Sequence, residues 1–392
     1  MKTIRLVLKP GKEKPIQGRH PWIYSGAIDQ VDEDYKTGDL VRVYSARDEF
    51  LGTGYLNPRS QIAVRMLSFV EAEIDRPFFE EKIQAALELR RRFIPPETDA
   101  CRLIHSEGDF LPGLTVDRYA DYLVVQFQTA GIDQWRETIL DILTEKIHPQ
   151  GIYEKDDTEA REWEGLEKRV GLLRGEEPPD YVEIRENGVS FIVDIHGGQK
   201  TGFFLDQRDN RKLIGGLSKG KRVLNLFAYT GGFSLYAARA GATRVVSVET
   251  SEKALNTARE NFEKNDFKGN AYEFIRKDAF EYLRETPEEF DVIVVDPPAF
   301  AKSRDHVMQA SRAYKDINLW AMKRVSAGGL VYSSSCSSYV DPDLFQKIIF
   351  AAAKDARRDA QILQKTSHAA DHPINIYHPE GEYLKGLLCL IR

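Results

Sequence analysis

Cysteine and long apolar runs are scarce in this sequence of 392 residues. Its three cysteines, Cys101, Cys336 and Cys389, are too few and too scattered for a disulfide framework or a zinc cluster. No apolar run approaches the ~20 residues of a membrane span, and the first ten residues carry charges where a secretory signal would be apolar. We therefore expect reduced thiols, a cytoplasmic location, no metal and no membrane partner.

An overall excess of basic charge is also missing, because the formal net charge is −6. This argues against a uniformly basic nucleic-acid binder. The charge is uneven, however: residues 1–70 contain 11 Lys and Arg against 8 Asp and Glu, a net charge of +3. A local basic patch can contact phosphates, although a charged surface without a partner would give the same counts.

The turn at 228–232 lacks both common phosphate-binding glycine patterns, G-x-G-x-x-G and G-x-x-x-x-G-K-[S/T]. It follows an apolar run of strand length and precedes apolar residues at helical spacing, as in the first half of a βαβ unit. Its glycine pair still lets a ligand approach the backbone. Glu249 follows Gly231 by 18 residues, near the distance at which a carboxylate reaches a ribose. The turn predicts a nucleoside without pyrophosphate, such as S-adenosylmethionine (SAM); a tight turn without a ligand is the alternative.

Short alternating segments fill residues 1–70 and predict a small β-barrel of four or five strands. The pattern GDLV (38–41), GTGY (52–55) and IAVR (62–65) resembles a PUA domain, a small RNA-binding barrel. Basic and aromatic side chains can neutralise phosphates and stack on bases, although Trp22 could equally pack in the core. The predicted RNA-binding residues are Lys12, Lys14, Arg19, His20 and Trp22.

Residues 71–185 predict an α+β domain, in which we find no catalytic constellation. An amphipathic helix over 77–93 ends in three arginines, which suit either the negative end of the helix dipole or a phosphate partner. Residues 154–186 contain twelve acidic and six basic residues, and this composition predicts a solvated connecting region.

Residues 186–392 predict an α/β domain with a parallel sheet. The segment 291–295 is an almost continuous apolar run, typical of a strand that is buried on both faces. The polar, glycine-rich stretch 196–211 predicts ligand contact. Because the carboxyl ends of parallel strands meet at a ligand crevice, polar residues at successive strand ends are expected to lie together. These residues are Glu249, Asp278, Asp296 and Cys336.

Five motifs together resemble the class I SAM-dependent methyltransferases that modify cytosine C5 in 23S rRNA and carry an N-terminal PUA domain. The motifs are TGFFLDQRDNR (201–211), NLFAYTGGF (225–233), DPPAF (296–300), SCS (335–337) and DHP (371–373). The resemblance covers essentially the whole chain and implies an rRNA substrate, with homodimers as one state of the family. It also implies a PUA domain at 1–70, a central α+β domain at 71–185 and a Rossmann-like methyltransferase domain at 186–392.

The resemblance implies a SAM pocket as well. Glu249 would bind the ribose hydroxyls, Asp278 would bind the adenine amino group, and the backbone of 228–231 would surround the methionine part. Asn225 stands where many class I methyltransferases have Asp, so a salt bridge to the amino group of SAM is not expected there. The implied cofactor-binding residues are Thr201, Phe203, Arg208, Asn225, Phe227, Ala228, Tyr229, Thr230, Gly231, Glu249, Thr250, Ser251, Asp278, Ala279 and Asp296.

The chemistry of cytosine supports the assignment, because C5 is a poor nucleophile. Addition of a thiolate at C6 and a proton at N3 makes C5 reactive, and a base then removes the C5 proton so that the thiolate can leave. We predict Cys336 and Asp296, a thiol and a carboxylate at neighbouring strand ends, as the catalytic pair. Ala299 stands where many RNA cytosine-5 enzymes have a second cysteine. A small buried residue is the alternative for Cys336.

Two other functions stay open at this point. Methylation of guanine at N7 or N2 in rRNA starts from an adequate nucleophile, so it does not need Cys336. A protein that binds SAM and RNA without catalysis would need neither Cys336 nor Asp296. The histidine-rich stretch 368–378 matches no standard zinc spacing, and the resemblance implies that it is a loop on the substrate side.

Overall fold

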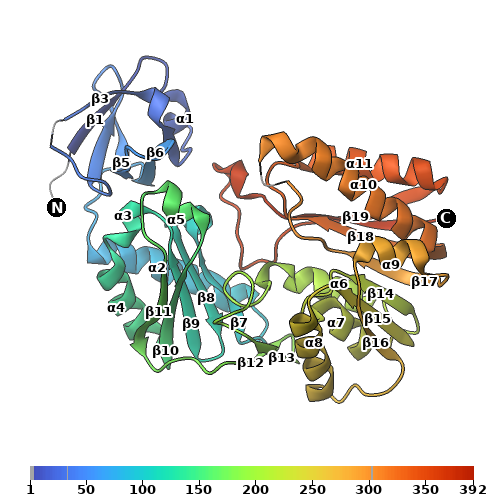
Figure 1. The fold of residues 1–392 in the computed structure, drawn as a ribbon. Coiled ribbons are helices and arrows are strands. Elements are labelled where there is room, and N and C mark those ends of the chain that lie inside the picture. The colour runs from blue at the N-terminus through green and yellow to red at the C-terminus, as the bar shows by residue number, and fades with distance from the viewer. Residues whose placement is uncertain (1–3, 33, 302) are drawn as a thin grey trace. The chain divides into compact units, whose positions relative to one another are not determined.

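The computed structural model describes residues 4–32, 34–301 and 303–392 (Figure 1). The chain forms two compact units, and each consists of several segments. Unit 1 contains Met1–Ile184, Val193–Leu205 and Ala370–Gly381. Unit 2 contains Arg185–Ile192, Asp206–Ala369 and Glu382–Arg392. The predicted boundaries at 70 and 185 stay predictions.

The N-terminal part of unit 1 is a six-stranded sheet in the order β2-β6-β5-β4-β1-β3. This confirms the predicted array of short strands, but with six strands in place of the four or five predicted. Side chains along β1 alternate between the two faces of the sheet, so Ile4, Leu6 and Leu8 are buried on one face. A Cβ at Gly54 would lie 2.4 Å from the carbonyl oxygen of Arg65, so glycine allows β5 and β6 to approach. The strands are β1 Ile4–Leu8, β2 Trp22–Tyr24, β3 Ile28–Val31, β4 Leu40–Tyr44, β5 Phe50–Leu56 and β6 Ile62–Ser68, and the short helix α1 spans Lys14–Gln17.

The central part of unit 1 is a five-stranded sheet in the order β11-β10-β9-β8-β7. The predicted helix over 77–93 is confirmed as α2 Arg76–Phe93, whose N-cap Asp75 accepts a hydrogen bond from the Phe78 amide at 3.0 Å. Of its three C-terminal arginines, Arg90 is buried in a bidentate ion pair with Asp109, at 2.6 and 2.7 Å. The other elements are β7 Ala100–His105, β8 Leu114–Tyr119, β9 Tyr122–Phe127, α3 Ala130–Asp133, α4 Arg136–Ile147, β10 Gly151–Asp156, α5 Glu159–Trp163 and β11 Arg169–Gly175.

The prediction of a solvated connecting region at 154–186 holds for most of its side chains but is wrong for its first three residues. Most residues of 157–181 are exposed or half-buried, although they form α5 and β11 rather than a linker, whereas 154–156 are buried at the end of β10. Every residue of β10 is buried, because its charges have partners. Arg161 is fully buried and donates to Asp156 at 3.0 Å, and Arg136 donates to Glu154 at 2.6 Å. A high content of charge therefore does not require exposure when opposite charges pair inside the protein.

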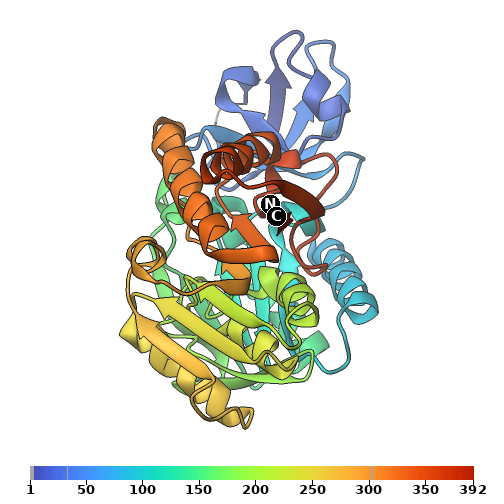
Figure 2. The ribbon, with the colours of Figure 1, turned by 90° about the vertical axis from the view of Figure 1, so that its right-hand side faces the viewer.

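Unit 2 contains a seven-stranded sheet in the order β16-β15-β14-β17-β18-β20-β19 (Figure 1 and Figure 2). The five strands from β16 to β18 are parallel, and β20 runs antiparallel to β18 and β19. This confirms the predicted parallel α/β sheet, including its buried central strand at 292–295. The strands are β14 Arg222–Leu226, β15 Arg244–Glu249, β16 Tyr272–Arg276, β17 Phe290–Val295, β18 Val325–Ser335, β19 Ala360–Thr366 and β20 Lys385–Ile391.

Helices between these strands complete the core of unit 2. Apolar residues of α9, α10 and α11 form one continuous buried cluster with the strands of the sheet. A two-stranded ribbon, β12 Val182–Glu186 and β13 Val189–Val193, precedes the sheet. Among the described residues, no helix is long and apolar enough to cross a membrane. The helices are α6 Arg208–Gly216, α7 Gly232–Arg239, α8 Glu252–Lys264, α9 Ala279–Glu285, α10 Val307–Arg324 and α11 Pro342–Ala356.

We predict that Arg161→Ala lowers the free energy of unfolding by roughly 3–5 kcal/mol, because it removes the buried guanidinium that binds Asp156 and the carbonyl oxygens of Phe127 and Glu167. Urea unfolding followed by circular dichroism measures the change. The matched control is Arg174→Ala, which breaks a half-exposed pair with Glu137 and should cost at most about 1 kcal/mol. Equal losses in the two variants would contradict the structural role of Arg161.

Candidate active site

The register of the parallel strands brings the predicted site residues of unit 2 to one edge of the sheet. Leu226 pairs with Val248 of β15 and with Val295 of β17, and Val295 pairs with Ser333 of β18. The residues that follow these positions therefore leave the sheet at the same edge. Glu249 and Asp296 are among them, and the chain after β18 continues to Cys336.

The glycine turn has an unusual backbone. Phe227, Tyr229 and Gly231 all have positive φ, at 55°, 48° and 80°. The first two are not glycine, and such conformations cluster at functional sites. A Cβ at Gly231 would lie 3.1 Å from the Cβ of Ala258, so glycine also allows α8 to pack closely. The turn is a defined structure: the amides of Ala228, Tyr229 and Gly231 donate to the carbonyl of Val248, to Glu249 and to the carbonyl of Ala228.

The Glu249 carboxylate joins this turn to the start of α8. Oε2 accepts a hydrogen bond from the Tyr229 amide at 3.0 Å, and Oε1 accepts from the amides of Thr250 and Ser251 at 2.8 and 3.0 Å. Ser251 in turn caps α8 by accepting from the Ala254 amide. Three backbone donors thus fix the carboxylate that the sequence assigns to a ribose.

Buried polar atoms beside the turn suit a polar ligand. Asn225 is 1% exposed and donates from Nδ2 to Ser234 Oγ at 2.9 Å. Its Oδ1 and the buried Oγ1 of Thr230 form no hydrogen bond with any described residue. An unmet buried acceptor costs about 1–3 kcal/mol, so a ligand that donates hydrogen bonds would be stabilised here. An ammonium group such as that of SAM fits this requirement.

Asp278 lies at the end of the next strand, as predicted. Its Oδ1 caps α9 by accepting from the amides of Phe280 and Glu281 at 2.9 and 3.1 Å. These bonds do not use Oδ2, and the side chain is exposed. Ala279 is buried as the first residue of α9.

Two residues that the sequence did not assign to the site hold Asp296 in place. Gln207 Nε2 donates to Asp296 Oδ1 at 2.8 Å, and the hydroxyl of Ser334 donates to the same oxygen. Gln207 is itself oriented by Asn210, whose Nδ2 donates to Gln207 Oε1 at 2.6 Å. The only sequence signal for Gln207 was its place in the polar stretch 196–211.

Cys336 is half-buried just beyond β18, between two buried serines. Ser335 Oγ donates to the hydroxyl of Tyr314 at 2.9 Å, and Ser337 Oγ accepts from the Ala301 amide at 3.1 Å. These contacts anchor the serines and leave the thiol between them partly accessible. The packing differs from that of Cys389, where burial raises the pKa of the thiol to about 11.

The remaining predicted cofactor residues are divided between the units. Thr201 and Phe203 belong to unit 1, where Thr201 Oγ1 donates to Asp117 at 2.6 Å and the Phe203 amide donates to Tyr119. Arg208 begins α6 in unit 2 and is 1% exposed. The cofactor roles of these three residues stay predictions.

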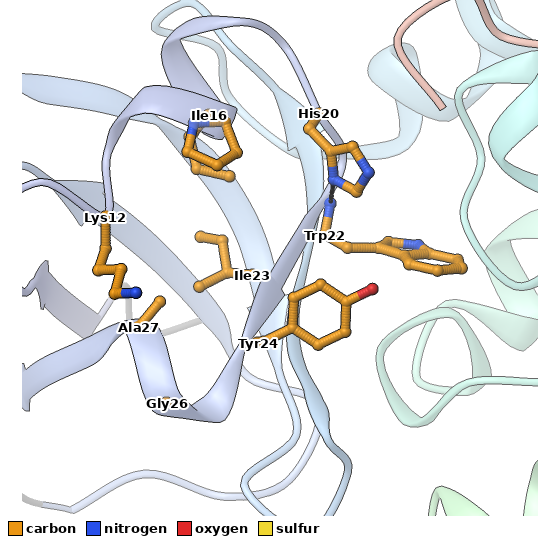
Figure 3. A pocket seen from close by; sticks show the side chains of 9 residues that line it. Lys12, Ile16, His20, Trp22, Ile23, Tyr24, Gly26 and Ala27 are labelled. Carbon is orange, nitrogen blue, oxygen red and sulfur yellow. Dashed lines mark hydrogen bonds between the residues drawn. The ribbon is translucent and has the colours of Figure 1, made fainter. Parts of the chain in front are cut away.

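A cavity of about 480 Å³ opens beside α1 and β2 in unit 1 (Figure 3). Three of the predicted RNA-binding residues, Lys12, His20 and Trp22, are among those that line it. The other two, Lys14 and Arg19, are exposed and are sequence neighbours of residues that line the cavity. The apolar part of the lining comes from Pro15, Ile16, Ile23, Tyr24 and Ala27.

Trp22 also packs within unit 1. Its indole nitrogen donates to Glu107 Oε1 at 2.8 Å, and its ring lies edge-on to His378 with 4.3 Å between ring centroids. Asp371 and His372 of the predicted substrate-side loop are buried in the same unit. Within the described part of the chain, no group of three or more His, Cys, Asp or Glu could hold a metal ion.

Comparison with known proteins adds independent findings. Residues 6–69 match the family of PUA-like domains, and residues 167–357 match the S-adenosylmethionine-dependent methyltransferases. Ribosomal RNA large subunit methyltransferase I of Aliivibrio fischeri is 44% identical over 396 residues, which cover 99% of this chain and 100% of that protein.

Solved structures show the same architecture. A SAM-dependent methyltransferase from Streptococcus mutans is 27% identical with a TM-score of 0.84, covering 98% of this chain and 99% of that one. A methyltransferase complexed with S-adenosylhomocysteine (SAH) has the same identity and TM-score and covers 100% of both chains. These similarities confirm the PUA-like domain, the Rossmann-like methyltransferase domain and SAM as the cofactor.

We predict that Glu249→Ala weakens SAM binding by about tenfold or more, equivalent to about 1.4 kcal/mol, and leaves RNA binding within about twofold. The reason is the loss of the carboxylate that three amides hold beside the turn. Isothermal titration calorimetry with SAM and filter binding with RNA measure the two affinities. Glu252→Ala, an exposed change on the first turn of α8, is the control; unchanged SAM affinity in Glu249→Ala would remove this residue from the pocket.

Proposed function

Because the chain belongs to the family of ribosomal RNA large subunit methyltransferase I, we propose that it methylates C5 of a cytidine in large-subunit rRNA. The observation that carries the choice of C5 is the placement of Cys336 and Asp296 beyond neighbouring strands of the SAM-binding domain. Methylation of guanine needs no thiol nucleophile, so it leaves this pair unexplained.

In the proposed reaction, the Cys336 thiolate adds to C6 of the base while N3 takes up a proton. The electron pair then available at C5 forms the new bond to the methyl group that SAM would supply, while the bond between that methyl group and the sulfonium sulfur breaks and S-adenosylhomocysteine is left. A base removes the C5 proton, the C6–S bond breaks, and N3 loses its added proton. The thiolate of Cys336 is regenerated, so the residue acts as a covalent catalyst.

Asp296, in its carboxylic acid form, is the group that we assign to donate the proton to N3, and its carboxylate takes that proton back at the end of the reaction. Gln207 and Ser334 both donate to its Oδ1. These two hydrogen bonds fix the orientation of the carboxyl group before the cytosine binds. Ala299 follows the two prolines after Asp296 and offers no second thiol. The C5 proton therefore passes to water or to another group of the chain.

The residues that we assign to the cofactor pocket of unit 2 lie at the same edge of the sheet. We assign Asn225 Oδ1 and the backbone of 227–231 to the methionine part of SAM, and Glu249 to the ribose. Asp278 Oδ2 is assigned to the adenine amino group, with Thr250, Ser251 and Ala279 nearby in the chain. The PUA-like domain contributes RNA affinity through the cavity beside α1 and the basic residues around it.

We predict that RNA containing 5-fluorocytidine forms an SDS-stable adduct with the wild-type protein. Fluorine at C5 cannot leave as a proton does, so the Cys336–C6 bond persists after methyl transfer. Cys336→Ala should form no adduct and lose methyl transfer by more than about 10³-fold. The control Cys101→Ala should still form the adduct.

A second result would decide against the covalent route. Intact methyl transfer by Cys336→Ala, together with no adduct in wild type, would overturn the assignment of Cys336 as the nucleophile.

We also predict a change in salt dependence for the double variant Lys12→Glu and Lys14→Glu. Loss of two phosphate contacts should weaken RNA binding and reduce the slope of log K against log salt by about 2. Fluorescence anisotropy measures RNA affinity at salt concentrations from roughly 50 to 300 mM, and the slope follows from these affinities. The control, Lys36→Glu with Arg47→Glu, changes the net charge equally at exposed residues outside the cavity lining; equal slopes in both variants would remove Lys12 and Lys14 from the interface.

A further inference from the structure

A buried lysine, Lys385, lies beside the loop that carries Cys336. It is the first residue of β20, it pairs in register with Ser335 of β18, and it is 5% exposed. Lysine is almost never buried to this extent unless the protein provides partners for the ammonium group. The proposed reaction has so far given this residue no role.

The ammonium group of Lys385 binds backbone carbonyls of the residues that follow Cys336 in the sequence. Lys385 Nζ donates to the carbonyl oxygens of Ser337 at 2.6 Å and of Val340 at 2.5 Å. Ser337 follows Cys336 directly, and both carbonyls belong to the loop between β18 and α11. These two bonds hold the loop against the first residue of β20.

The charge of Lys385 is not cancelled by a direct ion pair. Both acceptors are neutral carbonyls, and no described carboxylate lies within 4.0 Å of Nζ. The charged or titratable groups that act on it are Cys336, Glu382 and Asp341. Burial lowers the pKa of Lys385 to about 8, and the negative charges of these three groups oppose that shift. Below pH 8 the group is therefore mainly a cation, facing the nucleophile's loop from inside the protein.

We propose that Lys385 is a positioning residue for the methyl transfer: it fixes the Cys336 loop through two carbonyls and stabilises the Cys336 thiolate by its positive charge. This inference rests on the proposed role of Cys336 as the nucleophile. The thiol proton leaves to solvent before the C6–S bond forms, and Lys385 keeps its own proton throughout. The same charge stabilises the thiolate again when the C6–S bond breaks.

The test is the pH dependence of Cys336 alkylation by iodoacetamide, measured without RNA and without SAM. Mass spectrometry of the peptide that contains Cys336 separates it from the other two thiols. In Lys385→Met, the apparent pKa of Cys336 should rise by about one unit or more, since an adjacent positive charge favours the thiolate. Lys385→Arg keeps the charge and should shift the value by less than half as much.

Two further variants separate charge from structure. Lys385→Gln can still donate to the carbonyls but carries no charge, so it should raise the pKa of Cys336 as Lys385→Met does; it also replaces Lys385→Met if that variant does not fold. Lys155→Met is the matched control, because Lys155 is a buried lysine of unit 1 that also donates to two backbone carbonyls, of Ile195 and Gly198. It should leave the alkylation profile of Cys336 unchanged.

An unchanged alkylation pKa in folded Lys385→Met and Lys385→Gln would overturn the electrostatic role. The assay contains no substrate, so this failure is distinct from a failure of the proposed function, which would show as methyl transfer by Cys336→Ala. In the full reaction, the acid limb of the kcat/KM profile should move upward in Lys385→Gln by the same amount as the alkylation pKa.

Discussion

Parallel pairing of β14, β15, β17 and β18 is the constraint on which the site of unit 2 depends. Because Leu226 is level with both Val248 and Val295, and Val295 with Ser333, the chain leaves all four strands at one edge. Groups that are far apart in sequence are thereby brought within hydrogen-bond distance, as the Tyr229 amide and Glu249 are, and the hydroxyl of Ser334 and Asp296. A shift of one residue in any pair would turn the following side chain to the other face of the sheet.

Buried basic side chains occur in both units, and we assign them two different roles. In unit 1, Arg161 donates to Asp156 inside the central part, where burial raises the pKa of that carboxyl to about 8, so the contact contributes to packing and orientation. Lys385 of unit 2 is bound to neutral carbonyls, so its field extends to the neighbouring thiol. Lys155 is also bound to two carbonyls, so the distinguishing feature of Lys385 is that its acceptors belong to the loop that carries Cys336.

The sequence allowed the sheet, the glycine turn and four strand-end residues to be predicted, because apolar runs and their polar endings are local patterns. Glu249 and Asp296 were found in this way. Gln207, Ser334 and Lys385 were not assigned to the catalytic machinery, because their roles arise from contacts across the fold. Ser334 sits in a serine-rich run that gives no reason to prefer it, and Lys385 opens a strand that is otherwise apolar.

Amino-acid composition predicted solvent exposure wrongly where acidic and basic side chains pair inside the protein. The acidic stretch at 154–186 has the content of a solvated linker, and most of it is exposed. Its first three residues, 154–156, nevertheless end the buried strand β10, since the partners of their carboxylates come from α4 and α5. Trp22 shows another limit of sequence patterns: its indole contacts Glu107 and His378, which come from distant parts of unit 1, and its RNA-binding role stays a prediction.

The identity of the methylated nucleoside tests the central claim most directly. Unmodified large-subunit rRNA is incubated with the purified protein and SAM that carries a deuterated methyl group, then digested and analysed by mass spectrometry. The account predicts deuterated 5-methylcytidine with the wild-type protein and none with Cys336→Ala. Deuterated 7-methylguanosine or N2-methylguanosine in place of 5-methylcytidine would contradict it.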